Sequence, residues 1–185
     1  MQYFPDKNVL FIVQSLPIAL SAKIRINMDT QLKTLSLSYR EYASVDALSP
    51  ADQRLMQAAI DAAATAYAPY SHFSVGAALR LSDGSIVCGS NQENAAYPSG
   101  LCAERTALFA AGAQAPNTPV EALAIVARTP DGQLSEAAPC GACRQVMAET
   151  RQRSGCPLRI LMYLSDGRIR EVPDIAVLLP FAFQL

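Results

Sequence analysis

Histidine is nearly absent from this 185-residue sequence, which contains only His72. A single histidine excludes the three-histidine and two-histidine ligand sets that many zinc enzymes use. Charged residues are also scarce, at 17% of the chain, and their signs nearly cancel to a formal net charge of −1. Because no basic excess is available to bind phosphate backbones, we expect no nucleic-acid partner and a small or compact substrate instead.

Apolar runs long enough to cross a membrane are missing as well. The apolar stretch at residues 9–20 is too short for a spanning helix. Only Lys7 supplies a positive charge before it, which makes it a poor signal peptide. We predict that residues 1–27 are a non-core N-terminal extension. Residues 28–185 are expected to form one domain, with its core in about 50–185 and no membrane partner.

The sequence has five cysteines, and an odd number that includes a C-x-x-C pair is a poor disulfide framework. Cys88 and Cys156 are interpreted as structural thiols, because free cysteine commonly packs as a small hydrophobe. The other three, Cys102, Cys140 and Cys143, are candidate metal ligands. Thiolate ligands need a reducing compartment, since oxidation would consume them, and we therefore expect a cytoplasmic protein.

Hydrophobic periodicity and turn residues predict helices that alternate with strands. Ser49 followed by Pro50 suits the start of a helix that Ala68-Pro69 is expected to end. Asp83-Gly84, between two apolar runs, indicates a hairpin with a type I′ turn. Strands are predicted over residues 73–81, 86–91, 123–127, 160–164 and 169–172, and helices over 102–111 (closed by Gly112), 140–151 and 173–179. This order predicts a three-layer α/β/α sandwich around a mixed sheet.

Two short motifs carry the chemistry: Cys102-Ala103-Glu104 and, well downstream, Pro139-Cys140-Gly141-Ala142-Cys143. A structural zinc site closes its coordination with four protein ligands, whereas a catalytic site supplies three and leaves one position open. Each motif is predicted to begin a helix, where unpaired N–H groups and the helix dipole lower the pKa of a thiol. Three thiolates with Glu104 beside them therefore indicate hydrolytic zinc chemistry, in which the acid moves a proton.

The chain resembles the small homotetrameric cytidine deaminases over almost three quarters of its length. The resemblance is carried, in the family's order, by residues 70–78, 89–97, 102–105, 139–145 and 178–183. It implies a five-stranded sheet, a homotetramer and one Zn²⁺ per subunit held by three cysteines, with Glu104 as the proton shuttle. Arg105 matches an arginine that hydrogen-bonds a ligand thiolate and would offset the negative charge of the site.

The resemblance also implies a nucleoside pocket. Asn91 and Glu93 match residues that hold the ribose 3′-hydroxyl, and an amide with a carboxylate can serve as donor and acceptor there. Phe73 matches an aromatic residue of the pyrimidine pocket, and Ala103 would bind the base through its backbone. Phe183 matches an aromatic residue that reaches the site of a neighbouring subunit. The alternatives are a turn position for Asn91 and a core position for Phe73.

The predicted function is zinc-dependent hydrolytic deamination of cytidine and 2′-deoxycytidine to uridine and 2′-deoxyuridine, with release of ammonia, in pyrimidine salvage. A related deaminase acting on a substrate such as blasticidin S would keep the zinc and Glu104 but alter the pocket. A zinc-stabilised structural module is the non-enzymatic alternative. It requires a fourth protein ligand, for which His72 is available, and it leaves Glu104 without a role.

Overall fold

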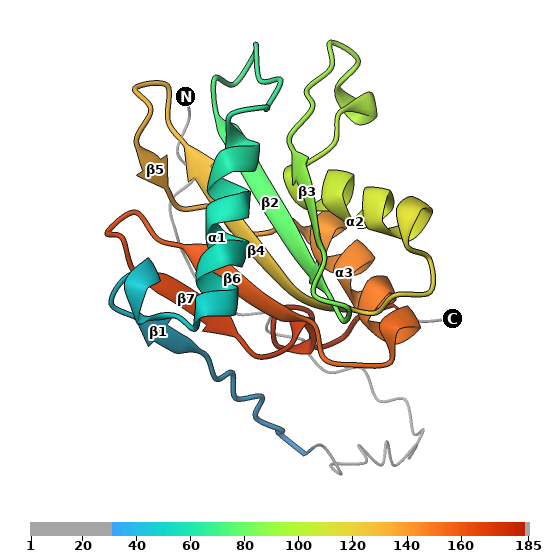
Figure 1. Ribbon diagram of the computed structural model, residues 1–185. Helices are drawn as coiled ribbons and strands as arrows, with labels where there is room; N and C mark the ends of the chain where they lie inside the picture. The colour runs from blue at the N-terminus through green and yellow to red at the C-terminus, as the bar shows by residue number, and fades with distance from the viewer. Residues whose placement is uncertain (1–30, 184–185) are drawn as a thin grey trace, which may run out of the picture. The chain divides into compact units, whose positions relative to one another are not determined.

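A mixed sheet of seven strands forms the centre of the structure (Figure 1), a computed structural model that describes residues 31–183. The strands are β1 (Arg40–Tyr42), β2 (Ser74–Leu81), β3 (Ile86–Ser90), β4 (Val120–Arg128), β5 (Leu134–Ser135), β6 (Arg159–Tyr163) and β7 (Ile169–Val172). Their order is β1-β7-β6-β4-β2-β3, with β5 paired to β4. The β4–β6 pair is parallel and the other pairs are antiparallel, which confirms the predicted mixed sheet.

The predicted number of five strands is wrong, because β1 and β5 add two short strands to the five that the sequence indicates. β1 has no alternation of apolar residues, so its sequence gives no strand signal. Side-chain contacts with β7 hold it on the edge of the sheet. The Tyr42 hydroxyl donates to Glu171 at 2.5 Å, and the Arg170 guanidinium donates to Glu41 at 2.9 Å.

Three α-helices lie in the described range: α1 (Pro50–Ala63), α2 (Ala103–Gln114) and α3 (Gly141–Ser154). The predicted start of α1 is confirmed, because the Ser49 hydroxyl accepts a hydrogen bond from the Asp52 backbone N–H at 3.2 Å. The predicted end at Ala68-Pro69 is wrong, since α1 ends at Ala63. Before Pro69 is reached, the Tyr67 backbone pairs with the chain at Asn91 and Glu93.

Three other local predictions need correction. Gly112 lies inside α2 and does not end it, at a cost of about 1 kcal/mol relative to alanine. The β2–β3 hairpin has positive φ only at Gly84 (83°), so it is a three-residue loop closed by a left-handed glycine and not a type I′ turn. The helix predicted over residues 173–179 is a single 3₁₀ turn, Ile175–Val177.

Alternate side chains of the central strands pack against different helices. Ala78 and Ala124 belong to a buried cluster with α1, whereas their neighbours Leu79 and Ile125 belong to a second cluster with α2 and α3. Figure 1 shows α1 on one face of the sheet, with α2 and α3 next to each other on the opposite face. The strand predicted over residues 123–127 is confirmed as part of β4, and its nearly continuous burial shows that both faces are covered.

Two glycines allow helices to approach the sheet closely. A Cβ on Gly76 of β2 would lie 2.0 Å from the Ala59 carbonyl oxygen of α1. A Cβ on Gly89 of β3 would lie 2.4 Å from the Ala107 nitrogen of α2. Contacts this short are forbidden, so only glycine permits these helix positions. Gly89 in particular sets the position of α2, which begins at the candidate metal ligand Cys102.

Candidate metal centre

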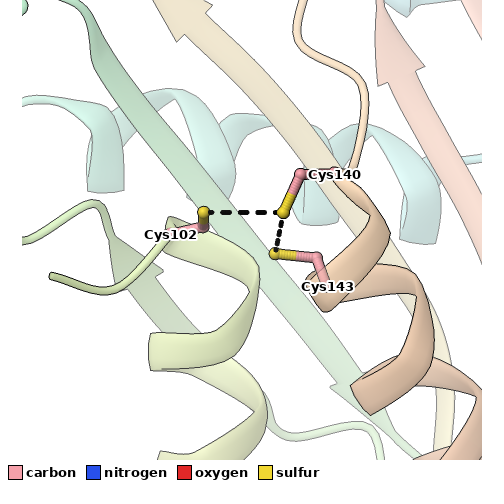
Figure 2. Close-up of side chains that lie close together, drawn as sticks. All are labelled: Cys102, Cys140 and Cys143. Atoms are coloured by element: carbon pink, nitrogen blue, oxygen red, sulfur yellow. Dashed lines mark hydrogen bonds between the residues drawn. The ribbon is translucent and has the colours of Figure 1, made fainter. Parts of the chain in front are cut away.

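The beginnings of α2 and α3 bring three thiols together. Cys102 is the N-cap of α2, Cys140 is the N-cap of α3, and Cys143 lies in the first turn of α3. Figure 2 shows the three sulfur atoms pointing toward one another. The Sγ atoms of Cys102 and Cys140 are 3.9 Å apart, and those of Cys140 and Cys143 are 3.5 Å apart. All three ligand atoms lie within 4.8 Å of one another.

This donor set fits zinc. Sulfur atoms bound tetrahedrally to one zinc at about 2.3 Å are about 3.8 Å apart, close to the observed separations. The three cysteines are free thiols, and residues 31–183 contain no further His, Cys, Asp or Glu that joins them in a potential metal site. His72 is therefore outside the group. Three ligands with no fourth are typical of a catalytic and not a structural zinc site.

One thiol of the cluster, that of Cys102, ionises readily. Hydrogen bonding by Cys143 lowers the pKa of Cys102 to about 5, and Arg105 and Cys140 contribute to the same effect. The pKa of Cys143 is raised, chiefly by its hydrogen bond to Cys102 and by burial. The first proton of the group is thus lost easily and the next only with difficulty. A bound dication would remove this resistance, because it stabilises the thiolate form of every ligand.

Arg105 contacts the centre as the sequence predicts. Its Nη2 atom donates to the Cys102 sulfur at 3.8 Å, and this interaction raises the pKa of the arginine. The Nε atom of Arg105 is buried without a hydrogen-bond partner in the described part of the chain. Because its Nη2 atom contacts the Cys102 sulfur, the guanidinium group offsets part of the negative charge of the thiolates.

Glu104 is buried, with 4% of its surface exposed, beside the thiol cluster. Burial raises the pKa of Glu104, and the nearby Cys102 thiolate acts in the same direction. A carboxyl group in this position exchanges a proton at a higher pH than an exposed glutamate does. The side chain lines the same cavity as Cys102 and Cys140, so it can reach a ligand bound there.

The cavity has a volume of about 390 Å³, in the range of small-molecule sites. Its lining includes two metal-ligand candidates, the catalytic candidate Glu104, and all but one of the residues predicted to bind substrate. These are Cys102, Cys140, Glu104, Phe73, Asn91, Glu93 and Ala103. Sequence reasoning missed the other lining residues, which are Ser71, Val75, Glu136, Ala137 and Ala138. The last three directly precede Pro139-Cys140, and this proximity was the only available signal.

Asn91 and Glu93 connect the cavity to the loop before β2. The Asn91 amide accepts from the Val75 N–H at 2.7 Å and donates to the Phe73 carbonyl at 2.9 Å. One Glu93 oxygen accepts from the backbone N–H groups of Tyr70 and Ser71. Hydrogen bonds from Ser71 and Tyr70 lower the pKa of Glu93, which keeps it ionised. Both side chains thus hold the loop that carries Phe73.

Phe183 is the predicted substrate residue that the structure does not bring to this cavity. Its side chain is 68% exposed, and its carbonyl oxygen accepts a hydrogen bond from Gln145 of α3 at 3.0 Å. An aromatic side chain that stays so exposed is available to a second copy of the chain. Its predicted role in a neighbouring subunit stays a prediction.

Residues 49–155 match the family model of the cytidine and deoxycytidylate deaminase zinc-binding region. The chain belongs to this family. Within that match lie the three cysteines, Glu104, and the candidate substrate residues except Phe183. A cytidine deaminase of Halalkalibacterium halodurans is 47% identical over 133 residues, which cover 71% of this chain and 92% of the relative.

Solved cytidine deaminase structures share the fold. One from Burkholderia pseudomallei has 43% sequence identity and a TM-score of 0.60, and the match covers 70% of this chain and 97% of that chain. One from Mycobacterium tuberculosis has 37% identity and a TM-score of 0.57, with 71% and 96% covered. The family match begins at residue 49, so β1 lies outside it.

Proposed function

We propose that this member of the deaminase family is a zinc-dependent hydrolase that converts cytidine and 2′-deoxycytidine to uridine and 2′-deoxyuridine, with release of ammonia, in pyrimidine salvage. One observation carries the proposal. Three thiols, spaced at 3.5 and 3.9 Å, lie in one site with the buried carboxyl group of Glu104. The identity of the relatives supports the choice of cytidine as substrate.

The three cysteines would hold one Zn²⁺ per subunit. When bound, zinc acts as a Lewis acid that lowers the pKa of water and stabilises developing negative charge. Arg105 reduces the excess negative charge of the thiolates through its contact with Cys102. The N-termini of α2 and α3 contribute further positive potential at Cys102 and Cys140.

Glu104 would move the protons of the reaction. It accepts a proton from the attacking water as the water oxygen adds to C4 of the cytosine ring. It then gives this proton to N3. It next takes the second proton from the added hydroxyl group and delivers it to the amino group, which leaves as ammonia as the C4–N bond breaks and the C4 carbonyl forms. Because Glu104 is buried and its pKa is raised, it can hold a proton between these steps.

The remaining lining residues would orient the nucleoside. Asn91 and Glu93 would bind the ribose 3′-hydroxyl, Phe73 would pack on the pyrimidine, and the Ala103 backbone would contact the base. The hydrogen bonds that Asn91 and Glu93 make to the loop support this proposal, because they fix both side chains before substrate arrives.

We also propose the finer features that the family resemblance implies. These are a homotetramer in which Phe183 reaches a neighbouring site, a three-layer α/β/α arrangement, and residues 1–27 as an extension outside the domain. The exposed Phe183 side chain supports the first of these. The free thiols support a reducing compartment such as the cytoplasm, and the net charge of −1 supports a partner other than nucleic acid.

The function is tested by the fall in ultraviolet absorbance when zinc-loaded protein is mixed with cytidine, 2′-deoxycytidine, cytosine or blasticidin S. We expect turnover of the two nucleosides and little of the other two. Turnover of blasticidin S alone would identify the related deaminase instead.

Glu104→Gln tests the proton-transfer role directly. This variant should retain zinc but lose activity by a factor of about 10² to 10⁴, the range for general acid–base catalysis. Glu149→Gln, at an exposed position of α3, is the control and should behave like the original protein. Normal activity in a zinc-loaded Glu104→Gln protein would refute the assignment.

A further inference from the structure

Arg144 directly follows the metal-ligand candidate Cys143 in α3 and has no part in the proposed proton transfer. The ion pairs found among residues 31–183 do not include it. A cation so close to the beginning of a helix also opposes the helix dipole. Neither an ion pair nor the stability of the helix itself therefore accounts for an arginine at this position.

The Arg144 guanidinium group binds two backbone carbonyl groups. Its Nε atom donates to the Pro139 carbonyl oxygen at 2.8 Å, and its Nη1 atom donates to the Leu178 carbonyl oxygen at 3.4 Å. Pro139 is buried and precedes the first carbonyl of the α3 ladder, which is that of Cys140. Within the described part of the chain, the Arg144 side chain is the hydrogen-bond donor to this Pro139 oxygen.

The contact with Pro139 bears on Cys140, the least supported of the three thiols. Cys143 is fully buried, and Cys102 receives the hydrogen bond from Arg105. Cys140 is exposed, so packing alone does not fix it. The Pro139 carbonyl group and the Cys140 N–H belong to one planar peptide unit, so a hydrogen bond to the oxygen limits rotation of the Cys140 backbone. It thereby helps to keep the Cys140 sulfur directed at the other two (Figure 2).

The contact with Leu178 anchors Arg144 to the C-terminal segment. Leu178 ends the 3₁₀ turn and packs, partly buried, against the core cluster that contains Cys143. The next residue of α3, Gln145, donates to the Phe183 carbonyl oxygen at 3.0 Å. The guanidinium group is therefore held from the side opposite Pro139 and bridges two segments that lie about 40 residues apart in the sequence.

We propose that Arg144 is a positioning residue of the metal centre, which holds Cys140 in place by bridging the Pro139 carbonyl group to the C-terminal segment at Leu178. It acts through Cys140 and touches neither substrate nor metal. The inference rests on the proposed function, because it takes the three thiols to be zinc ligands. Groups that orient a metal ligand typically change metal affinity about 10- to 100-fold when they are removed.

The test measures the zinc dissociation constant of three Arg144 variants by competition with a chromogenic chelator. Arg144→Ala should raise this constant about 10- to 100-fold. Arg144→Gln places an N–H donor at the same distance along the side chain as the arginine Nε, without the charge. It loses only the Leu178 contact, so the constant should rise about 2- to 10-fold. Arg144→Lys keeps the charge but has no donor at that place, so it should recover less than Arg144→Gln.

Arg151→Ala is the matched control. Arg151 lies on the same helix and binds the same C-terminal segment, through Asp174 at 2.6 and 2.8 Å, but it is at the far end of α3 from the thiols. It should lower the melting temperature and leave the zinc dissociation constant within about twofold of the original. With cobalt in place of zinc, the thiolate-to-metal absorption bands should weaken in Arg144→Ala and stay unchanged in Arg151→Ala.

Three results would overturn the inference. One is a normal zinc affinity and cobalt spectrum in Arg144→Ala. The second is an equal loss of zinc affinity in Arg151→Ala, which would indicate a general effect of stability. The third is full recovery in Arg144→Lys with none in Arg144→Gln, which would indicate that charge acts and position does not. Failure of the original protein to bind zinc is a separate outcome, because it refutes the proposed function itself.

Discussion

Replacement of Gly89 by alanine should separate α2 from the sheet and thereby damage the metal centre. The new Cβ would lie 2.4 Å from the Ala107 nitrogen and 2.6 Å from the Ala103 carbonyl oxygen. These are backbone atoms, so no side chain can rotate away. Ordinary contact begins near 3.4 Å, and α2 must therefore move by about 1 Å.

A displacement of this size is large for the site. Metal–ligand distances tolerate about 0.2 Å, and α2 carries Cys102 and Glu104, whereas α3 carries the other two thiols. We predict that Gly89→Ala lowers the free energy of unfolding by about 3 kcal/mol, weakens zinc binding, and reduces kcat/KM at least about 100-fold even when zinc is saturating. Zinc affinity is measured by competition with a chromogenic chelator, and stability by denaturant unfolding.

Two other glycines provide controls. Gly76→Ala should be equally destabilising, because its Cβ would lie 2.0 Å from the Ala59 carbonyl oxygen, but it displaces α1 and should leave zinc affinity nearly unchanged. Gly112→Ala has room for a methyl group and should stabilise α2 by about 0.5–1 kcal/mol. Normal zinc binding and cytidine turnover in Gly89→Ala would refute this role of Gly89. An equal loss of zinc in Gly76→Ala would refute it as well.

Two further predictions concern charged groups. Arg105→Ala should raise the pKa of Cys102, because the hydrogen bond from Arg105 to its sulfur is lost. Zinc affinity or turnover should fall about 10- to 100-fold, and Arg105→Lys should recover part of it. Unchanged zinc content and kinetics in Arg105→Ala would contradict this prediction. Burial tends to raise the pKa of Asp52, but hydrogen bonds from Arg159 and Arg80 outweigh it and lower the pKa below 3.8. A lowered carboxyl pKa adds stability above the unfolded-state value and loses it as the pH falls through the folded-state value. Asp52→Asn should thus lower the free energy of unfolding by about 3 kcal/mol at pH 7 and by progressively less below pH 4. Thermal unfolding of both proteins across this pH range measures the difference. A difference that stays constant with pH would contradict the prediction.

The sequence correctly predicted those elements whose signals lie in neighbouring residues. The cap at Ser49, the apolar run of β4 and the two cysteine motifs each depend on residues close together in the chain, and the structure confirms the elements they predict. The convergence of Cys102 with Cys140 could be predicted only because a catalytic metal requires it.

The missed features depend on contacts between distant segments. β1 forms because Tyr42 and Glu41 meet Glu171 and Arg170 more than 120 residues away, and no local pattern encodes such a pairing. The position of Glu136 at the cavity follows in the same way from the path of the chain after β5. These interactions are long-range and polar, so hydrophobic periodicity does not report them.

One metal ion between the beginnings of α2 and α3 is central to the proposed chemistry. Crystals of the zinc-loaded protein, measured on both sides of the zinc absorption edge, would locate that ion. We predict one anomalous peak per subunit, bonded to the sulfur atoms of Cys102, Cys140 and Cys143, with a non-protein fourth ligand beside Glu104. A peak completed by a fourth side chain, or no peak at these sulfurs, would contradict the account.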